Sequence, residues 1–207
     1  MHSQEDYFLL DLSVSNSDLA GVNLTDAAAV EDYIAQQARL QNSKVAYGGY
    51  LEERNLYQRS QHFKNESIEE RNIHIGVDLW TQAETAVICP IDGWVHSFKN
   101  NDSIGDYGPT IILKHKLENH TFYTLYGHLS LESIKNLKTG MLFKKGELLG
   151  NLGNSSENGD YAPHLHFQII KNMETYKGDY PGVCSKSDLN FYMENCPNPN
   201  LLLKIKN

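Results

Sequence analysis

Four histidines lie in short segments whose residue types could bind a metal ion and activate a water molecule. They are His74 in NIHIGVDLW, His128 in TFYTLYGHLS, and His164 and His166 in PHLHFQII. A neutral imidazole is a common zinc ligand, and its pKa near neutrality also allows it to accept a proton from water. The other five of the nine histidines have no partner at ligand spacing. Among them, His115 shares a strand face with apolar residues of IILKHKL, which predicts a hydrogen-bonded core histidine.

The segment NIHIGVDLW combines a strand pattern with two candidate ligands. Its β-branched residues alternate with His74, Gly76 and Asp78, which predicts a strand that carries the imidazole and the carboxylate on one face. A straight strand would separate the two Cα atoms by about 13 Å, which is awkward for ligands of one ion. Gly76 permits a bend that would bring the side chains together. By itself, the HxxxD pattern is weak.

The segments around the other histidines also alternate. In PHLHFQII the apolar residues point one way, and His164, His166 and Gln168 point the other way. Two such histidines lie about 6.6 Å apart at the backbone, so one can bind a metal while its neighbour overhangs the bound water. In TFYTLYGHLS we expect His128 to share a face with Tyr126. Each of these segments alone could be an ordinary part of a sheet.

Together, the three segments predict one metal centre. If the sheet brings them together, His74, Asp78 and one of the two histidines of HLH form a site with two nitrogen ligands and one carboxylate. Three protein ligands leave a position for water, which is the arrangement of catalytic rather than structural zinc. Zinc lowers the pKa of bound water toward about 7. Because the chain has no HExxH glutamate, we expect a remaining histidine to take the proton.

In their order along the chain, these segments resemble the signature of the lysostaphin-type (LytM-like) zinc metalloendopeptidases. That signature is HxxxD, then a histidine in YxHL, then HxH, and here it reads HIGVD, YGHLS and HLH. The run MLFKKGELLGNLGNSS is similar to another segment of that family, and the resemblance covers about residues 71–171. It implies a mainly β fold, a compact antiparallel sheet or sandwich of the duplicated hybrid motif kind, here with an N-terminal helical arm.

The resemblance also implies a role for each of these residues. His74, Asp78 and His166 would be the zinc ligands. His128 and His164 would be the catalytic pair, acting as general base and as stabiliser of the tetrahedral intermediate. The family hydrolyses peptide bonds, most often in peptidoglycan cross-links and frequently next to glycine. We therefore expect a zinc-dependent hydrolase with a peptide or amide substrate.

A narrower likeness implies a different substrate. The segments YGGYLEERNLY, CPIDGWVHSF and DYPGVCSKSD are similar to a domain of this type that is fused to class III aminotransferases in some large proteins. This likeness extends to about residues 45–204 and implies a small intracellular amide or peptide in place of the cell wall. The chain has Gly108-Pro109 where the family often has Gly-Asn, so any substrate contact of that asparagine is lost.

Two other functions are compatible with parts of the pattern. The glucose-specific IIA phosphocarriers share the β architecture and use an HxGxD segment, in which the histidine carries phosphate. HIGVD fits that pattern, but the phosphocarrier interpretation leaves YGHL and HLH without a role. A non-catalytic, zinc-retaining binding or regulatory module is the other alternative. Degenerate family members of that kind usually lose zinc ligands, whereas this sequence keeps all five functional positions.

The elements that must position these residues fall into four stretches. Residues 1–45 form an acidic arm with one predicted helix, and residues 46–70 form a connector that is rich in tyrosine. Residues 71–171 contain short β-rich runs separated by turn residues, which predicts a compact antiparallel β domain. The resemblance identifies these residues as the zinc peptidase β domain. Residues 172–207 form an extension that we expect to pack on that domain.

The arm and the connector contain apolar side chains that require burial, so we expect both segments to pack on the β domain. Thr25 can cap a helix over residues 26–40, whose apolar side chains fall on one side. Because the connector enters the β domain just before the first candidate ligand, we expect Arg54 and Tyr57 to reach the cleft, with Arg54 paired to a substrate carboxylate. Tyr126 is a further candidate substrate contact. An arm that only covers a sheet edge is equally compatible with the pattern.

The composition limits the classes of function. The chain has 207 residues, 40% of them hydrophobic, and a formal net charge of −8, which suits a globular domain and disfavours binding to nucleic acid. No apolar run is long enough for membrane insertion. The first residues are acidic and lack the apolar run of an export signal, so we expect a cytoplasmic protein. The three cysteines cannot all pair within the chain, which agrees with a reducing compartment, and the oligomeric state stays open.

Overall fold

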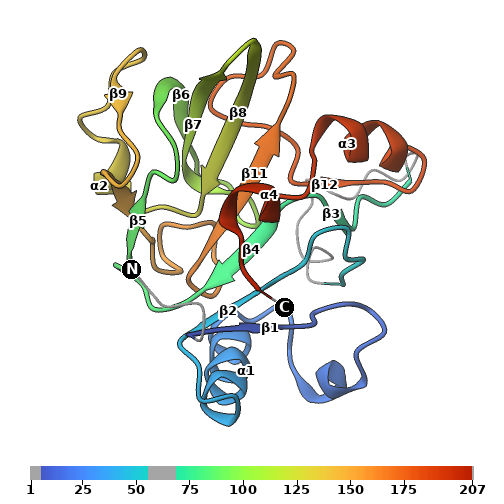
Figure 1. Ribbon diagram of the computed structural model, residues 1–207. Helices are drawn as coiled ribbons and strands as arrows, with labels where there is room; N and C mark the ends of the chain where they lie inside the picture. The colour runs from blue at the N-terminus through green and yellow to red at the C-terminus, as the bar shows by residue number, and fades with distance from the viewer. Residues whose placement is uncertain (1–5, 56–68, 207) are drawn as a thin grey trace.

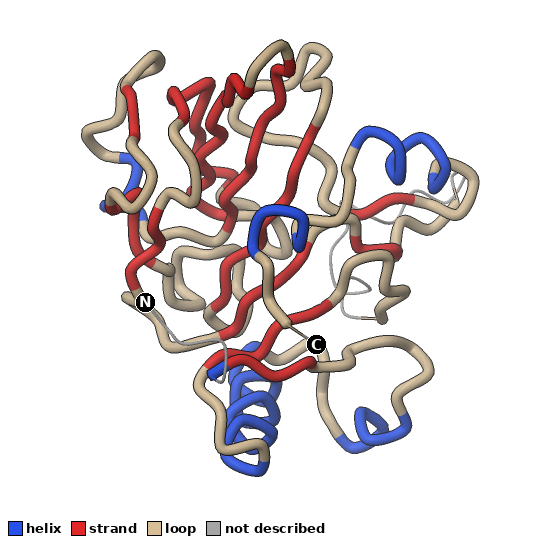
Figure 2. The backbone as a smooth tube through the Cα atoms, in the orientation of Figure 1, coloured by secondary structure: helices blue, strands red, loops and turns tan. Residues whose placement is uncertain are grey.

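An eight-stranded sheet organises the chain. Figures 1 and 2 show how the strands and the surrounding elements are arranged. The computed structural model describes residues 6–55 and 69–206. Across the sheet, the strands are β1 (Tyr7–Leu9), β2 (Val45–Gly48), β4 (Val77–Trp80), β11 (His164–Ile170), β8 (His120–Gly127), β7 (Gly108–Leu117), β6 (Gly93–Asn101) and β9 (Leu142–Phe143). Neighbouring strands are antiparallel except β1 and β2, which are parallel. The predicted mainly β, antiparallel fold is therefore confirmed.

Two small sheets and several short helices surround the large sheet (Figure 2). The small sheets pair β5 (Ala86–Ile88) with β10 (Leu148–Asn151), and β3 (Ile73–His74) with β12 (Val183–Cys184). The helices are the 3₁₀ helix η2 (Ser17–Gly21), α1 (Ala27–Leu40), α2 (Leu131–Ile134), α3 (Leu189–Asn195) and α4 (Asn200–Leu203). Within the described ranges, none of these helices has the length and apolar character needed to cross a membrane.

Successive side chains of β7 pack on opposite faces of the large sheet. Ile111 and Leu113 belong to a core cluster that contains Tyr126 and Phe167, whereas Ile112 belongs to a second cluster. All three β7 residues are fully buried. Because this part of the strand is covered on both faces, its sequence there, IIL, is continuously apolar.

Strand pairing aligns the candidate site residues in the middle of the sheet. His166 of β11 lies opposite Asp78 on one neighbouring strand and opposite Gly127 on the other. His164 lies opposite Trp80. The apolar residues that alternate with these histidines, Leu165 and Phe167, enter the first core cluster. The predicted alternation along PHLHFQII is therefore confirmed, and it directs both imidazoles to the other face.

The acidic arm is built into the sheet. Its strand β1 pairs with β2, which spans the predicted boundary between arm and connector, and β2 pairs with β4. Helix α1 lies beside β1 and β2 at one end of the sheet (Figure 1). Val30 and Ile34 of this helix are buried in a cluster with Phe8, Leu10 and Trp80. The arm therefore packs on the β domain, as its apolar residues predict.

The N-terminal cap of the arm helix differs from the prediction. Asp26 caps α1, because its Oδ1 accepts a hydrogen bond from the amide of Ala28 at 2.9 Å. Thr25 is instead engaged upstream, where its amide and hydroxyl both donate to Oδ1 of Asn23. The prediction that Thr25 caps the helix is therefore wrong, since Asn23 competes for its hydroxyl.

The C-terminal extension covers parts of both faces of the sheet. Tyr180, Cys184 and Cys196 belong to the second core cluster, and Leu202 and Leu203 of α4 pack against the first. The three cysteines are buried, and all are free thiols. This packing places the extension beside β3, the strand that carries the first candidate ligand.

Packing of the arm helix is expected to contribute measurably to stability. Ile34→Ala removes a buried side chain of α1 and should lower the free energy of unfolding by about 2 kcal/mol or more. Leu40→Ala is the matched control, because Leu40 is 70% exposed in the same helix and its truncation should change stability by at most about 0.5 kcal/mol. Urea unfolding measures both. Equal effects of the two substitutions would contradict the packing of the arm.

His115 is the hydrogen-bonded core histidine that its sequence predicts. Its Nδ1 donates to the carbonyl of Asp92 at 2.8 Å, and its Nε2 lies 2.6 Å from Oγ1 of Thr124. Burial lowers the pKa of His115 below its usual value, so the folded chain favours the neutral ring. The unfolded chain therefore binds this proton first as the pH falls through about 6.5.

This histidine should make stability depend on pH. Below about pH 6.5 the free energy of unfolding should decrease as the pH falls, with a contribution from His115 of at most about 1.4 kcal/mol per pH unit. His115→Gln keeps a polar side chain that does not titrate, so its slope of stability against pH should be shallower. Urea unfolding from about pH 7 to about pH 5 measures the two slopes. Identical slopes would rule out a neutral buried His115.

Candidate active site

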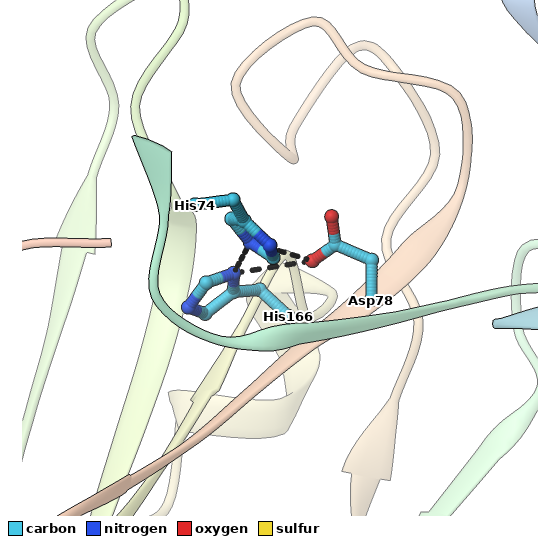
Figure 3. A group of neighbouring side chains, drawn as sticks. All are labelled: His74, Asp78 and His166. Atoms are coloured by element: carbon cyan, nitrogen blue, oxygen red, sulfur yellow. Dashed lines mark hydrogen bonds and ion pairs between the residues drawn. The ribbon is translucent and has the colours of Figure 1, made fainter. Parts of the chain in front are cut away.

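Three side chains converge at the middle of the sheet, as Figure 3 shows. His74 lies at the end of β3, Asp78 lies on β4, and His166 lies on β11. The strand breaks between His74 and Asp78 at Gly76, where a Cβ atom would lie 2.5 Å from the ring of His166. The expected bend is therefore present, and Gly76 also provides the space that His166 occupies.

The ligand atoms of the three residues lie close together. Nε2 of His74 is 2.9 Å from Nδ1 of His166 and 3.3 Å from Oδ1 of Asp78. Nδ1 of His166 is 3.1 Å from the same carboxylate oxygen. All three residues are at most 2% exposed. Two imidazole nitrogens and one carboxylate oxygen match the donor set of a catalytic zinc site.

The hydrogen bonds on the outer side of each ring determine where the protons lie. Nδ1 of His74 is 2.9 Å from the carbonyl of Gly49, which can only accept, so this nitrogen carries the hydrogen. Nε2 of His166 is 3.0 Å from Oε1 of Gln168, whose amide nitrogen donates to the carbonyl of Pro181. In the neutral rings, two nitrogen lone pairs and a carboxylate oxygen therefore face one another without a proton between them. This arrangement fits a bound cation.

Electrostatics favour the metal-binding protonation states of His74 and Asp78. Burial lowers the pKa of His74 to about 4, although the nearby Asp78 opposes this shift. Burial alone would raise the pKa of Asp78, but its electrostatic interactions with the His74 ring and the Arg54 guanidinium hold it well below its usual value. Near neutral pH the imidazole is therefore neutral and the carboxylate is ionised, which is the state that binds a metal.

Two further histidines form a pair beside the three ligands. The rings of His128 and His164 lie 4.1 Å apart between centroids. Nδ1 of His128 donates to the carbonyl of Asn158, and Nδ1 of His164 donates to that of Ala162, each at 2.7 Å. Each neutral ring therefore keeps Nε2 as its proton acceptor. Burial lowers the pKa of both histidines, and for His128 the neighbouring His164 adds to the effect.

The five residues line a common cleft with a volume of about 250 Å³. Tyrosines and the C-terminal extension form much of its wall, and the lining residues beyond these five are Arg71, Gly105, Asp106, Tyr107, Tyr161, Tyr176, Asp179, Tyr180, Pro181, Gly182 and Val183. The structure thus brings together all the residues that the sequence assigns to metal binding and catalysis. A peptide-sized group can enter a cleft of this volume, in which buried polar atoms are directed at one position.

Sequence reasoning missed several residues that surround the histidines. Tyr107 packs its ring against His128 and His166, and its hydroxyl is 3.4 Å from Nε2 of His166. Asn158 is fully buried and orients His128, and it also accepts a hydrogen bond from the amide of Tyr161. These residues lie in loops, where alternation carries no information. The turn sequence ENGDY is the one local signal near Asn158.

Tyr126 does not contact the cleft, contrary to the prediction. It is 1% exposed, packs against Phe167 in the first core cluster, and lies within hydrogen-bonding distance of Thr124. The prediction assumed that Tyr126 and His128 share a strand face. Strand β8 ends at Gly127, however, and His128 has a positive φ of 61°. This turn directs the histidine to the opposite side of the sheet.

Arg54 also lies elsewhere than predicted. It is 1% exposed and does not line the cleft. Its Nη1 donates to Oδ2 of Asp78 at 2.6 Å, so the carboxylate that it binds belongs to the protein and not to a substrate. Arg54 therefore pairs with a carboxylate, as predicted, but this carboxylate is the side chain of Asp78. Tyr57 lies outside the described residues.

We compared the chain with known protein families and solved structures. Peptidase family M23 matches residues 72–177, which is about half of the chain. The catalytic domain of the antimicrobial peptidase lysostaphin from Staphylococcus simulans is 24% identical, with a TM-score of 0.41 over 66% of this chain and 96% of that domain. A zinc-containing peptidase from Vibrio cholerae is 26% identical, with a TM-score of 0.39 over 51% of this chain and 29% of that one. No curated protein sequence matches the chain.

The two histidines of HLH should differ in their effect on metal content. His166→Ala removes a nitrogen of the donor set and should abolish stoichiometric zinc binding. His164→Ala, two positions along the same strand, should leave zinc binding intact, because its Nε2 is 3.9 Å from Oδ1 of Asp78 and lies outside the donor set. Zinc content after dialysis, measured by mass spectrometry, distinguishes the variants. Equal loss in both would refute the ligand assignment.

Proposed function

Because this chain belongs to peptidase family M23, we propose that it is a zinc-dependent hydrolase that cleaves peptide or amide bonds. The observation that supports the proposal most directly is the donor set. The unprotonated ligand atoms of His74, Asp78 and His166 point at one position. The other polar atom of each side chain forms a hydrogen bond within the protein. Three such ligands leave room for water in the coordination sphere of zinc.

The chain would divide the chemistry between the metal and the two other histidines. Zinc, when bound, supplies the acidity that makes water a nucleophile near neutral pH. His128 and His164 present Nε2 to the cleft as neutral rings, so one of them can accept the proton of the attacking water and deliver it to the leaving nitrogen. The other ring lies against it and, when its Nε2 carries a proton, can donate to the negative charge that develops on the substrate.

The cleft is compatible with a peptide or amide substrate. A volume of about 250 Å³ lies beside the donor set. A glycine-containing peptide of the kind found in peptidoglycan cross-links is one candidate, and a small intracellular peptide or amide is the other. We propose hydrolysis of a peptide or amide bond as the common chemistry, and a panel that contains both substrate types would separate them.

The same geometry disfavours the two alternative functions. A phosphocarrier needs a histidine nitrogen that a phosphoryl donor can reach, but His74 is 1% exposed and both its nitrogens face protein atoms. A non-catalytic module would not require two further histidines, each oriented by a backbone carbonyl beside the donor set. The complete set of five residues therefore favours a hydrolase.

The catalytic pair provides the test of the proposed activity. His128→Ala and His164→Ala should each reduce kcat by about 10²–10⁴-fold, which is the usual contribution of a general acid or base. His96→Ala is the control, because His96 lies on β6 outside the cleft and should keep wild-type activity. The assay is hydrolysis of the peptide panel by zinc-loaded protein. A zinc-loaded wild type that cleaves no peptide would refute the hydrolase and favour a binding module.

A further inference from the structure

Residues that precede the family-matched segment contact two of the three candidate ligands. The segment from Gly49 to Arg54 runs along β3 and forms backbone hydrogen bonds with it, including the amide of Leu51 to the carbonyl of His74 at 2.8 Å. Gly49 accepts from Nδ1 of His74, and Arg54 donates to Oδ2 of Asp78. Family M23 matches the chain only from residue 72, so these contacts come from outside the matched segment.

Arg54 is buried behind the Asp78 carboxylate. A guanidinium in such a place requires charged or aromatic partners, and it has three of them. It forms ion pairs with Asp78 and Glu52, and its Cζ lies 5.4 Å from the ring centroid of Trp80. The chain also makes room for it at Gly49, where φ is +97° and a Cβ atom would lie 1.8 Å from Nη2 of Arg54. The position of the Arg54 side chain is therefore fixed by two ion pairs, an aromatic ring and the backbone at Gly49.

Glu52 connects this arginine to the N-terminal arm. One oxygen of Glu52 accepts from Nε of Arg54, and the other accepts from the amide of Leu12 at 3.2 Å. Leu12 is 2% exposed and belongs to the same apolar cluster as α1 and Trp80. Trp80 in turn stacks on the ring of His164, with 5.8 Å between centroids and 27° between planes. Buried contacts thus lead from the arm to a ligand and to a catalytic histidine.

We propose that Arg54 is a positioning residue of the metal centre. The N-terminal arm holds Arg54 in place through Glu52, and Arg54 in turn restricts Asp78 to binding the metal through one oxygen. The inference rests on the proposed zinc site. Oδ2 of Asp78 is occupied by the guanidinium, so Oδ1 alone faces the two ligand nitrogens. Without Arg54, the carboxylate can turn and offer both oxygens. The arm then supports the metal centre through Glu52, in addition to covering a sheet edge.

Metal binding by the full-length chain tests this role without relying on catalysis. Arg54→Met keeps much of the side-chain volume and removes the ion pair, so the Kd for zinc should rise by about 10–100-fold in a competition with a chromogenic chelator. Cobalt(II) in place of zinc should give strong visible absorption in the wild type and weaker absorption in Arg54→Met, because a second carboxylate oxygen raises the coordination number. Arg54→Lys should restore part of both signals, since lysine keeps the charge but not the fork of donors.

Two further variants distinguish a positioning role of Arg54 from an effect on the stability of the folded chain. Arg39→Met makes the same chemical change on the exposed last turn of α1, and it should alter neither the zinc Kd nor the cobalt spectrum. If Arg54→Met fails to fold, Glu52→Gln carries the test, because it weakens the hold on Arg54 and should shift both signals less, in the same direction.

The outcomes distinguish this inference from the proposed function. The inference would be overturned if the wild type binds zinc and Arg54→Met has the same zinc Kd and the same cobalt spectrum. The same holds for Glu52→Gln where that variant is used. The proposed function would still stand. A wild type that binds no zinc would overturn both.

Discussion

The ionised carboxylate of Asp78, buried at the centre of a sheet, is the feature on which the rest of the site depends. A carboxylate that loses its water requires compensation by cations and hydrogen-bond donors, and Asp78 is 2% exposed. Arg54 satisfies one oxygen, and the other lies between the imidazoles of His74 and His166. The bend at Gly76 and the close approach of Gly49 to Arg54 both serve to place these groups around one carboxylate.

The strands and the loops make different contributions to the site. The registers of β4, β11 and β8 align Asp78 with His166 and keep the apolar side chains on the other face. The orientation of the His74, His128 and His164 rings, in contrast, depends mainly on single backbone carbonyls at Gly49, Asn158 and Ala162. These carbonyls select which ring nitrogen is a donor, and therefore which nitrogen can bind a metal or accept a proton.

The arm links the assembly of the site to the assembly of the whole chain. The strand β2 and the residues after it lie between the apolar cluster of α1 and the ligand strands. A ligand that binds only the folded chain stabilises it in proportion to its affinity. Metal binding and arm packing should therefore support each other, because Glu52 and Arg54 connect Leu12 of the arm to Asp78.

The sequence by itself determined the elements with a regular period and the residue types that they carry. The alternation in PHLHFQII predicted which residues face the core, the glycine in HIGVD predicted the bend, and three motifs in order predicted the five residues that meet in the cleft. Tyr126 was misassigned because the same alternation does not continue through His128, whose positive φ ends it. Arg54 was predicted to bind a carboxylate, but only the tertiary structure decided that this carboxylate is Asp78, 24 positions away. The physical reason is that alternation is a local property of the backbone, whereas a hydrogen bond to Asn158 or an ion pair to Asp78 depends on strand register and on loops that pack from distant parts of the chain.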